Sequence, residues 1–209
     1  MSGAARGPTG GAHLPPGWLS QVRLPIIELA ADSTFVRIHR TSQAPIFFSP
    51  GDRRSPAGRF DSAGGLFGVL YLAFSFDGAF AETVLRNPAR RLVGLAEITP
   101  RSLAVLALSR GVRLVSMLGP GLQALGVDNA VTTGPYAPCG IWADALYAHA
   151  VRPDGIAYAS RHDPEQLCVA LFSRPDISVN LASESAPLED MLSEVAAMLR
   201  RYGKGLDLS

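Results

Sequence analysis

Hydrophobic and polar positions alternate in several short stretches of this chain. In residues 34–40, TFVRIHR, Arg37 and His39 share one face with Phe35, and two aliphatic residues occupy the other. This is the two-residue period of a β-strand. We therefore predict a strand over residues 34–40, with one face in the core and the other toward water or a ligand.

Other stretches are continuously apolar or nearly so. Such runs of four to eight residues are typical of buried strands. They predict strands over residues 67–73, 92–98, 103–108, 155–160 and 166–172.

Helical spacing of apolar residues predicts helices over residues 75–85, 141–150 and 188–202. Ser75 is a favourable N-cap, and Asn87-Pro88 ends the first helix. For the last helix, Ser185 is the expected cap and Gly203 the expected stop. Strands dominate the middle of the chain with helices scattered among them, which predicts a single α+β domain.

Two segments lack such a pattern. Residues 1–20, rich in Gly, Pro and Ala, predict a flexible arm, with Trp18 and Leu19 joining its end to a domain over residues 21–209. The connection over residues 41–66 is long and rich in Pro and Gly, and loops of this kind are either functional or disordered.

Composition narrows the class of protein. With 209 residues, 47% of them hydrophobic, the chain suits one domain with a sizeable core. A net charge of +1 lacks the basic footprint of a general nucleic-acid binder. Residues 62–76, an uncharged and largely apolar stretch, are too few to span a bilayer, and residues 1–16 lack the apolar segment of a secretory signal. We expect a cytoplasmic protein with no membrane contact.

Several known site motifs are absent from the sequence. It contains no HExxH, no Cys/His cluster at zinc spacing, no phosphate-binding GxxxxGK[ST] loop, no GxGxxG after a strand and no GxSxG elbow. We expect no metal. Cys139 and Cys168 are predicted to be buried free thiols, and the four histidines are isolated from one another.

One constellation does carry chemistry. Gly58-Arg59-Phe60-Asp61 is followed by VLYLA at 69–73 and by AFAET at 79–83, with Arg37 upstream and GIAYAS at 155–160 downstream. This arrangement resembles the RES domain, over roughly residues 33–175. The resemblance implies a fold like that of ADP-ribosyltransferase toxins, in which helices flank a mixed or antiparallel sheet whose cleft binds NAD. It also implies a toxin that cleaves the nicotinamide–ribose bond of NAD and pairs with a helix-turn-helix antitoxin.

That chemistry gives each residue an expected role. Arg37 and Arg59 would bind the pyrophosphate of NAD through their guanidinium forks, and Tyr71 would hold the nicotinamide ring. Glu82 would stabilise the positive charge that develops on the ribose. Ser160 would hydrogen-bond the carboxamide or a ribose hydroxyl.

We therefore predict Glu82, Arg59 and Ser160 as catalytic residues. Arg37, Arg59, Tyr71 and Ser160 are predicted to bind NAD, with His39 as a further contact. Arg40 can assist or replace Arg37, although strand alternation places these two arginines on opposite faces and favours Arg37.

Three functions remain open at this stage. The first is NAD cleavage by water or inorganic phosphate, and the second is transfer of ADP-ribose to a protein. No second glutamate lies within two residues of Glu82, which favours a small nucleophile. The third is a non-catalytic module that binds NAD or a partner.

The regions 41–58 and 100–155 are long for a RES domain and can form a lid, a partner surface or a substrate platform. The oligomeric state stays open.

Overall fold

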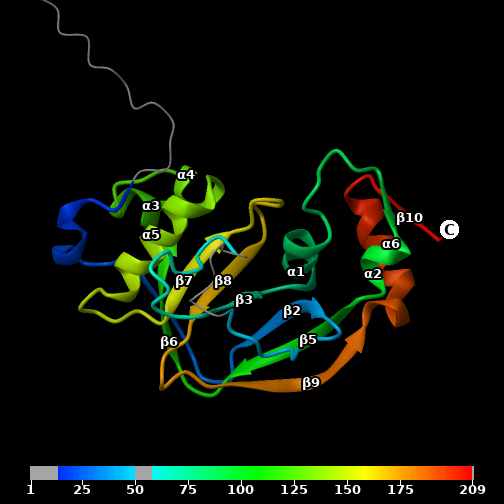
Figure 1. The fold of residues 1–209 in the computed structure, drawn as a ribbon, viewed down its shortest axis with the longest axis horizontal. Coiled ribbons are helices and arrows are strands. Elements are labelled where there is room, and N and C mark those ends of the chain that lie inside the picture. Colours follow the sequence, from blue (N-terminus) through cyan, green and yellow to red (C-terminus); the bar gives the residue numbers. More distant parts are fainter. Residues whose placement is uncertain (1–13, 50–57, 209) are drawn as a thin grey trace, which may run out of the picture.

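The computed structural model describes residues 14–49 and 58–208, and within them an eight-stranded sheet forms the centre of the molecule (Figure 1). Its strand order is β1-β6-β7-β8-β3-β2-β5-β9. Neighbouring strands are antiparallel except β6 and β7, which are parallel. The strands are β1 (Ile26–Leu29), β2 (Thr34–Arg40), β3 (Val69–Ala73), β5 (Arg101–Leu108), β6 (Val112–Met117), β7 (Gly155–Ala159), β8 (Leu167–Phe172) and β9 (Val179–Pro187).

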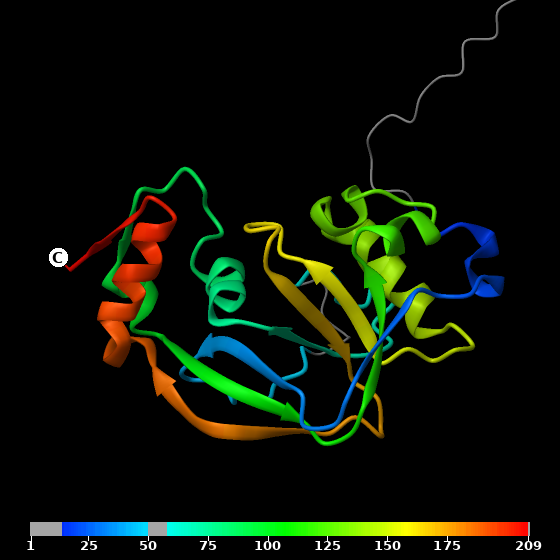
Figure 2. The same cartoon turned by 180° about the vertical axis from the view of Figure 1, so that it is seen from behind.

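Helices gather at the two ends of this sheet, with α1 between them (Figures 1 and 2). One end carries α3 (Pro120–Ala124), α4 (Ala130–Thr133) and α5 (Tyr136–Tyr147). The other end carries α2 (Leu95–Ile98), the 3₁₀ helix η2 (Leu188–Met191), α6 (Leu192–Arg201) and a parallel pair of short strands, β4 (Leu92–Gly94) and β10 (Gly205–Asp207). Helix α1 (Phe76–Thr83) follows β3 directly.

The core lies on both faces of the sheet. Strand alternation sends Val69 into one cluster with the helices, where Phe80 and Trp142 are fully buried. Leu70 points to the opposite face and packs there with Phe35. The expectation of a single α+β domain with a mixed sheet flanked by helices is confirmed.

Three boundaries differ from the sequence prediction. Residues 92–98 were expected to form one strand, but only β4 is extended; Gly94 ends it and α2 begins at Leu95. The predicted helix over 141–150 runs instead from Tyr136 to Tyr147, because Pro135 caps it earlier in the chain.

Ser185 is not a helix cap, contrary to the prediction. It lies in β9, and α6 begins after Met191. Five consecutive exposed residues in β9, 180–184, give no alternation from which a strand could be predicted. The stop at Gly203 is confirmed, since this residue has φ +63° immediately after the last turn of α6.

Near the N-terminus, residues 17–21 form the 3₁₀ helix η1, and Leu19 is buried against the domain. The carbonyl of Leu19 accepts a hydrogen bond from Nε2 of His149 at 3.2 Å. The rest of the predicted arm, residues 1–13, and residues 50–57 of the predicted long loop lie outside the described residues. Among the helices that the structure describes, none is long and apolar enough to cross a bilayer.

Candidate active site

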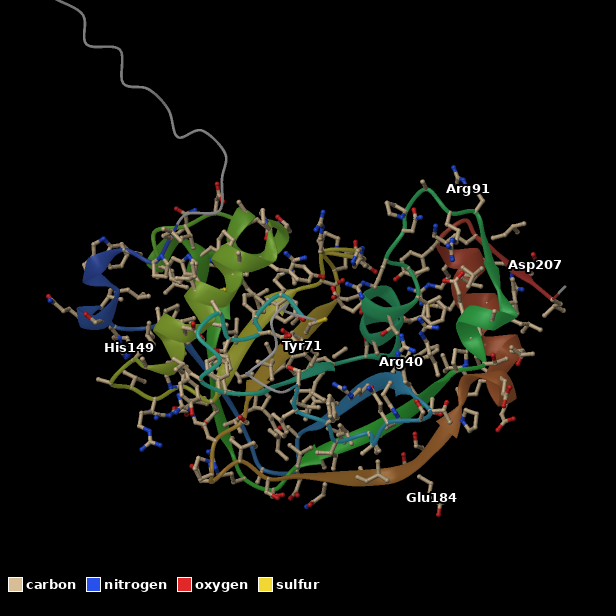
Figure 3. The ribbon with its side chains drawn as sticks, viewed as in Figure 1. Arg40, Tyr71, Arg91, His149, Glu184 and Asp207 are labelled. Atoms are coloured by element: carbon tan, nitrogen blue, oxygen red, sulfur yellow. The ribbon has the colours of Figure 1, made fainter. Side chains whose placement is uncertain are left out.

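A cleft of about 370 Å³ opens beside α1, where strands β2 and β3 diverge. These two strands pair only at Val36 and Ala73, the last residue of β3, so the part of β3 that precedes Ala73 has no ladder pairing with β2. Figure 3 shows Tyr71 near the middle of the molecule and Arg40 below α1. Five residues predicted for the site line the cleft: Arg37, His39, Arg59, Tyr71 and Glu82.

Arg37 occupies the gap between the diverging strands. Its Nη1 donates to the carbonyl of Tyr71 at 2.8 Å, a carbonyl that no β2 residue pairs with. Burial lowers the pKa of Arg37 to about 10, and its Nε is buried without a partner among the described residues. No carboxylate in the described part of the chain forms an ion pair with Arg37, so a bound anion is what would balance its charge.

Arg59 enters the cleft from the turn that contains Gly58 and Phe60. Its Nη1 donates to the carbonyl of Gly134 at 2.5 Å, and its guanidinium lies 5.1 Å from the centre of the Tyr136 ring. The hydroxyl of Tyr136 accepts a hydrogen bond from Nη2 of Arg86 at 2.9 Å. Tyr136, the first residue of α5, thus orients two arginines that come from different parts of the chain.

The spacing of the Gly-Arg-Phe-Asp turn and the Tyr71 strand has a geometric reason. Asp61 accepts hydrogen bonds from the Tyr71 hydroxyl at 2.9 Å and from the Gly58 amide at 2.8 Å, and the Phe60 amide donates to that same hydroxyl at 2.8 Å. A Cβ on residue 58 would lie 2.3 Å from the tyrosine ring, so only glycine fits.

The Tyr71 hydroxyl is therefore hydrogen-bonded within this turn. The Tyr71 ring forms part of the cleft wall. Burial, with the negative charge of Asp61 as a lesser cause, raises the pKa of Tyr71 well above its ordinary value. The group stays a neutral phenol under physiological conditions. Asp61 is structural, as its place in the turn implies.

Glu82 lies on α1, which the predicted cap holds in place. Oγ of Ser75 accepts from the Gly78 amide at 3.0 Å and donates to the Gln166 side chain at 2.7 Å. Phe80 and Ala81, the two residues before Glu82, are fully buried, whereas Glu82 itself is half-buried and lines the cleft. One carboxylate oxygen accepts from the Arg161 amide at 3.2 Å, and the other has no hydrogen-bond donor among residues 14–49 and 58–208.

Ser160 has a different position from the other predicted site residues. It is buried and is not among the described residues that line the cleft. Its Oγ accepts hydrogen bonds from the amides of His162 at 3.1 Å and Asp163 at 3.3 Å. In this structure Ser160 shapes the turn that brings the Arg161 amide to Glu82.

The two histidines of the cleft are held differently. His39 is buried, with Nδ1 bonded to the Arg40 carbonyl at 2.9 Å and Nε2 to the Ser185 hydroxyl at 2.8 Å. A carbonyl only accepts hydrogen bonds, so Nδ1 carries a proton. His162 follows Ser160 and lines the cleft, and burial lowers its pKa despite the nearby charge of Glu82.

Sequence reasoning missed several residues of the cleft. Arg86 lies four residues after Glu82, just beyond the end of α1, and its closeness in the sequence to Glu82 could have identified it. Nothing local marks the other three: Arg101, Tyr136 and His162 reach the cleft from distant segments. Alternation favoured Arg37 over Arg40, but the divergence of β2 from β3 lets both line the cleft.

The cleft is strongly cationic. Among the described residues that line it, five are arginines, and Glu82 is the single acidic one. Such a site suits a ligand with more than one phosphate, and the lone carboxylate suits a developing positive charge.

Cys168 also lines the cleft; both cysteines are free and buried, as predicted, and burial raises the pKa of each thiol. In the described part of the chain, no three His, Cys, Asp or Glu residues gather as a metal site would require.

Comparisons with known proteins show the family and the fold of this chain. A curated relative, a probable toxin named y4kH from Sinorhizobium fredii, is 32% identical over 108 residues, which cover 51% of this chain and 84% of the relative. The crystal structure of the MbcT–MbcA toxin–antitoxin complex of M. tuberculosis contains a chain of similar fold, with a TM-score of 0.57 at 14% identity. That alignment covers 84% of this chain and 91% of the other. The model of the RES domain matches residues 34–189, three quarters of the sequence, and this chain therefore belongs to the RES domain family.

Proposed function

We propose that this protein is a toxin-type enzyme that consumes NAD by cleaving its nicotinamide–ribose bond, with water or inorganic phosphate as the nucleophile. The observation that carries the proposal is the pairing of one carboxylate, Glu82, with several arginines in a single cleft. Family membership supports it, because the matched residues 34–189 include every residue that the mechanism uses.

In this mechanism Arg37 and Arg59 bind the pyrophosphate of NAD. Arg37 has a buried guanidinium that no described carboxylate neutralises, and Arg59 is held in place by Gly134 and Tyr136. Tyr71, which lines the cleft, contacts the nicotinamide ring with the face of its own aromatic ring. These contacts fix the dinucleotide with its ribose toward α1.

The bond between C1′ of the ribose and the nicotinamide nitrogen then breaks, and its electron pair leaves with neutral nicotinamide. Positive charge develops on the ribose, and the carboxylate of Glu82 stabilises it electrostatically. An oxygen of water or phosphate forms the new bond to C1′. Water releases its proton to solvent or to a neighbouring base, and the products are ADP-ribose or its phosphorylated form.

Transfer of ADP-ribose to a protein is the alternative outcome of the same cleavage. In both cases we propose an antitoxin partner that restrains the enzyme. The relative from Sinorhizobium fredii is named a probable toxin, and the chain of similar fold was crystallised in a toxin–antitoxin complex. The helix-turn-helix character of such a partner is an expectation from the family resemblance.

The test compares Glu82→Gln with the wild type. We expect NAD consumption to fall by at least about a hundredfold, because the charge opposite the ribose is lost. Purified protein is incubated with NAD, with and without inorganic phosphate, and the products are identified by mass spectrometry. Glu194→Gln, on the exposed surface of α6, is the matched control and should retain full activity.

The products distinguish the acceptors. ADP-ribose in both reactions indicates a hydrolase, and a phosphorylated ADP-ribose formed only with phosphate indicates a phosphorylase. Intact NAD in both reactions of the wild type, with no difference from Glu82→Gln, would exclude cleavage of free NAD. Incubation of labelled NAD with a cell lysate then tests transfer to a protein.

A further inference from the structure

Three arginines of the cleft have no role in the proposed binding of the pyrophosphate. Arg40 ends β2, Arg101 begins β5, and Arg86 follows α1. All three line the cleft. Neither Arg86 nor Arg101 lies in the motif segments that carry the resemblance to the RES domain, so the roles expected from it do not account for them.

Two of them are neighbours on adjacent strands of the sheet. Arg40 and Arg101 are direct partners in the antiparallel pairing of β2 with β5. Directly opposed residues of such a pair have their Cβ atoms about 5 Å apart, and like charges at these positions are destabilising. Stability alone would therefore not favour two arginines here.

Arg86 adds a third positive charge to the pair. The pKa of Arg101 is lowered, first by burial and then by the charges of Arg40 and Arg86. Within residues 14–49 and 58–208, none of the three forms an ion pair, and the one side-chain contact of the group is that of Arg86 with the neutral hydroxyl of Tyr136. The positive charge of the group is therefore not neutralised by direct ion pairing with a carboxylate of the described residues.

We propose that Arg40, Arg86 and Arg101 form a second anion-binding subsite of the cleft, separate from Arg37 and Arg59, that takes a phosphate group. A phosphate dianion offers oxygens to several guanidinium groups at once. Its attraction for each of them would offset their mutual repulsion. Arg37 and Arg59 are each bonded to a backbone carbonyl, whereas Arg40 and Arg101 have no described side-chain partner and keep their donors for a ligand.

Two sources supply this chemistry. One is free inorganic phosphate, and the other is a phosphate monoester on the dinucleotide itself, as in NADP. The binding of phosphate by this subsite does not depend on the proposed function, but its role in NAD cleavage does. The experiment therefore needs a binding measurement as well as an activity measurement.

Binding is measured by isothermal titration calorimetry with inorganic phosphate at constant ionic strength. We expect Arg101→Gln to weaken phosphate binding at least about tenfold, because charge-assisted hydrogen bonds are lost. Arg40→Gln should have a similar effect, and because Arg40 is exposed, this variant also covers the case in which Arg101→Gln does not fold. Arg200→Gln, on the exposed face of α6, is the matched control and should bind phosphate as the wild type does.

Activity distinguishes the two sources. If free phosphate is the ligand, Arg101→Gln raises the phosphate concentration needed for half-maximal rate and leaves the KM for NAD within about twofold. If the monoester is the ligand, the wild type prefers NADP over NAD and the variant loses this preference.

Two results would overturn the subsite: no phosphate binding by the wild type, or equal phosphate affinity in the wild type, Arg101→Gln and Arg40→Gln. If phosphate binding is lost in the variants but the wild type leaves NAD and NADP intact, the subsite stands and the proposed function fails. The two proposals are thus tested separately.

Discussion

Individual residues of the cleft owe their behaviour to their immediate surroundings more than to their type. Glu82 would be an ordinary helix glutamate if α1, in which Phe80 and Ala81 are fully buried, did not place it at the cleft. Tyr71 would be an ordinary buried tyrosine if its hydroxyl were not shared between Asp61 and the Phe60 amide. These contacts hold both side chains in fixed positions. Exposed surface side chains have no such fixed positions.

His162 provides a prediction at this scale. Burial lowers its pKa from 6.5 in the folded protein. The unfolded chain therefore binds a proton more readily than the folded protein near pH 6, and the stability contributed by neutral His162 is lost as the pH falls through this range. We expect the free energy of unfolding to decrease from pH 7.5 to 5.5 and to decrease less in His162→Gln.

Urea denaturation followed by circular dichroism at several pH values measures this difference. Parallel pH profiles for the wild type and His162→Gln would show that His162 binds protons equally in both states.

At the scale of elements, helix α1 is the part of the site that the chain builds locally. Its cap, its buried face and Glu82 all lie within residues 75–83. The cap has a second role, since Ser75 also contacts Gln166, at the end of the turn that carries His162. Helix α1 and this turn are thereby joined on one side of the cleft.

Ser75→Ala tests this connection. We expect a loss of about 1 kcal/mol in the free energy of unfolding, because the Gly78 amide loses its acceptor. Ser75→Asp keeps an acceptor for the helix but cannot donate to Gln166, so it should recover most of the stability. Thermal and urea denaturation measure both variants; equal stability of the wild type and Ser75→Ala would refute the role of the cap.

At the scale of the whole molecule, strand ends far apart in the sequence are joined by buried polar groups. Asp154 accepts from the Arg113 amide at 2.8 Å and from Nη2 of Arg110 at 2.9 Å. The same Arg110 atom contacts Asp176 at 2.7 Å. The Asp154 side chain is 7% exposed and the Asp176 side chain 65% exposed, which makes the two carboxylates a natural comparison.

We predict that Asp154→Ala lowers the free energy of unfolding by about 3 kcal/mol, because it removes the acceptor of the Arg113 amide and the buried ionic partner of Arg110. Asp176→Ala should cost less than about 0.5 kcal/mol, as expected for an exposed ion pair. Urea denaturation measures both variants. Similar losses in the two would contradict the importance of burial here, and neither variant should alter NAD consumption per folded molecule, since neither residue lines the cleft.

Prediction from the sequence succeeded where the signal is local. The alternation in residues 34–40, the cap at Ser75 and the stop at Gly203 each depend on neighbours within one element, and the structure has all three. It failed for Ser185 and for β9, whose exposed residues pair with β5 through backbone hydrogen bonds that leave no hydrophobic pattern.

The sequence by itself determined the α+β class, the strand of Arg37, the helix of Glu82 and the motif spacing that identifies the RES family, because each depends on side-chain periodicity or on contacts between near neighbours. Only the tertiary structure decided which distant side chains share the cleft with Glu82. Arg101, Tyr136 and His162 come from segments that long-range strand pairing and helix packing bring to α1. Charges that meet in this way leave no trace in local patterning, since their proximity is set by the core that folds beneath them.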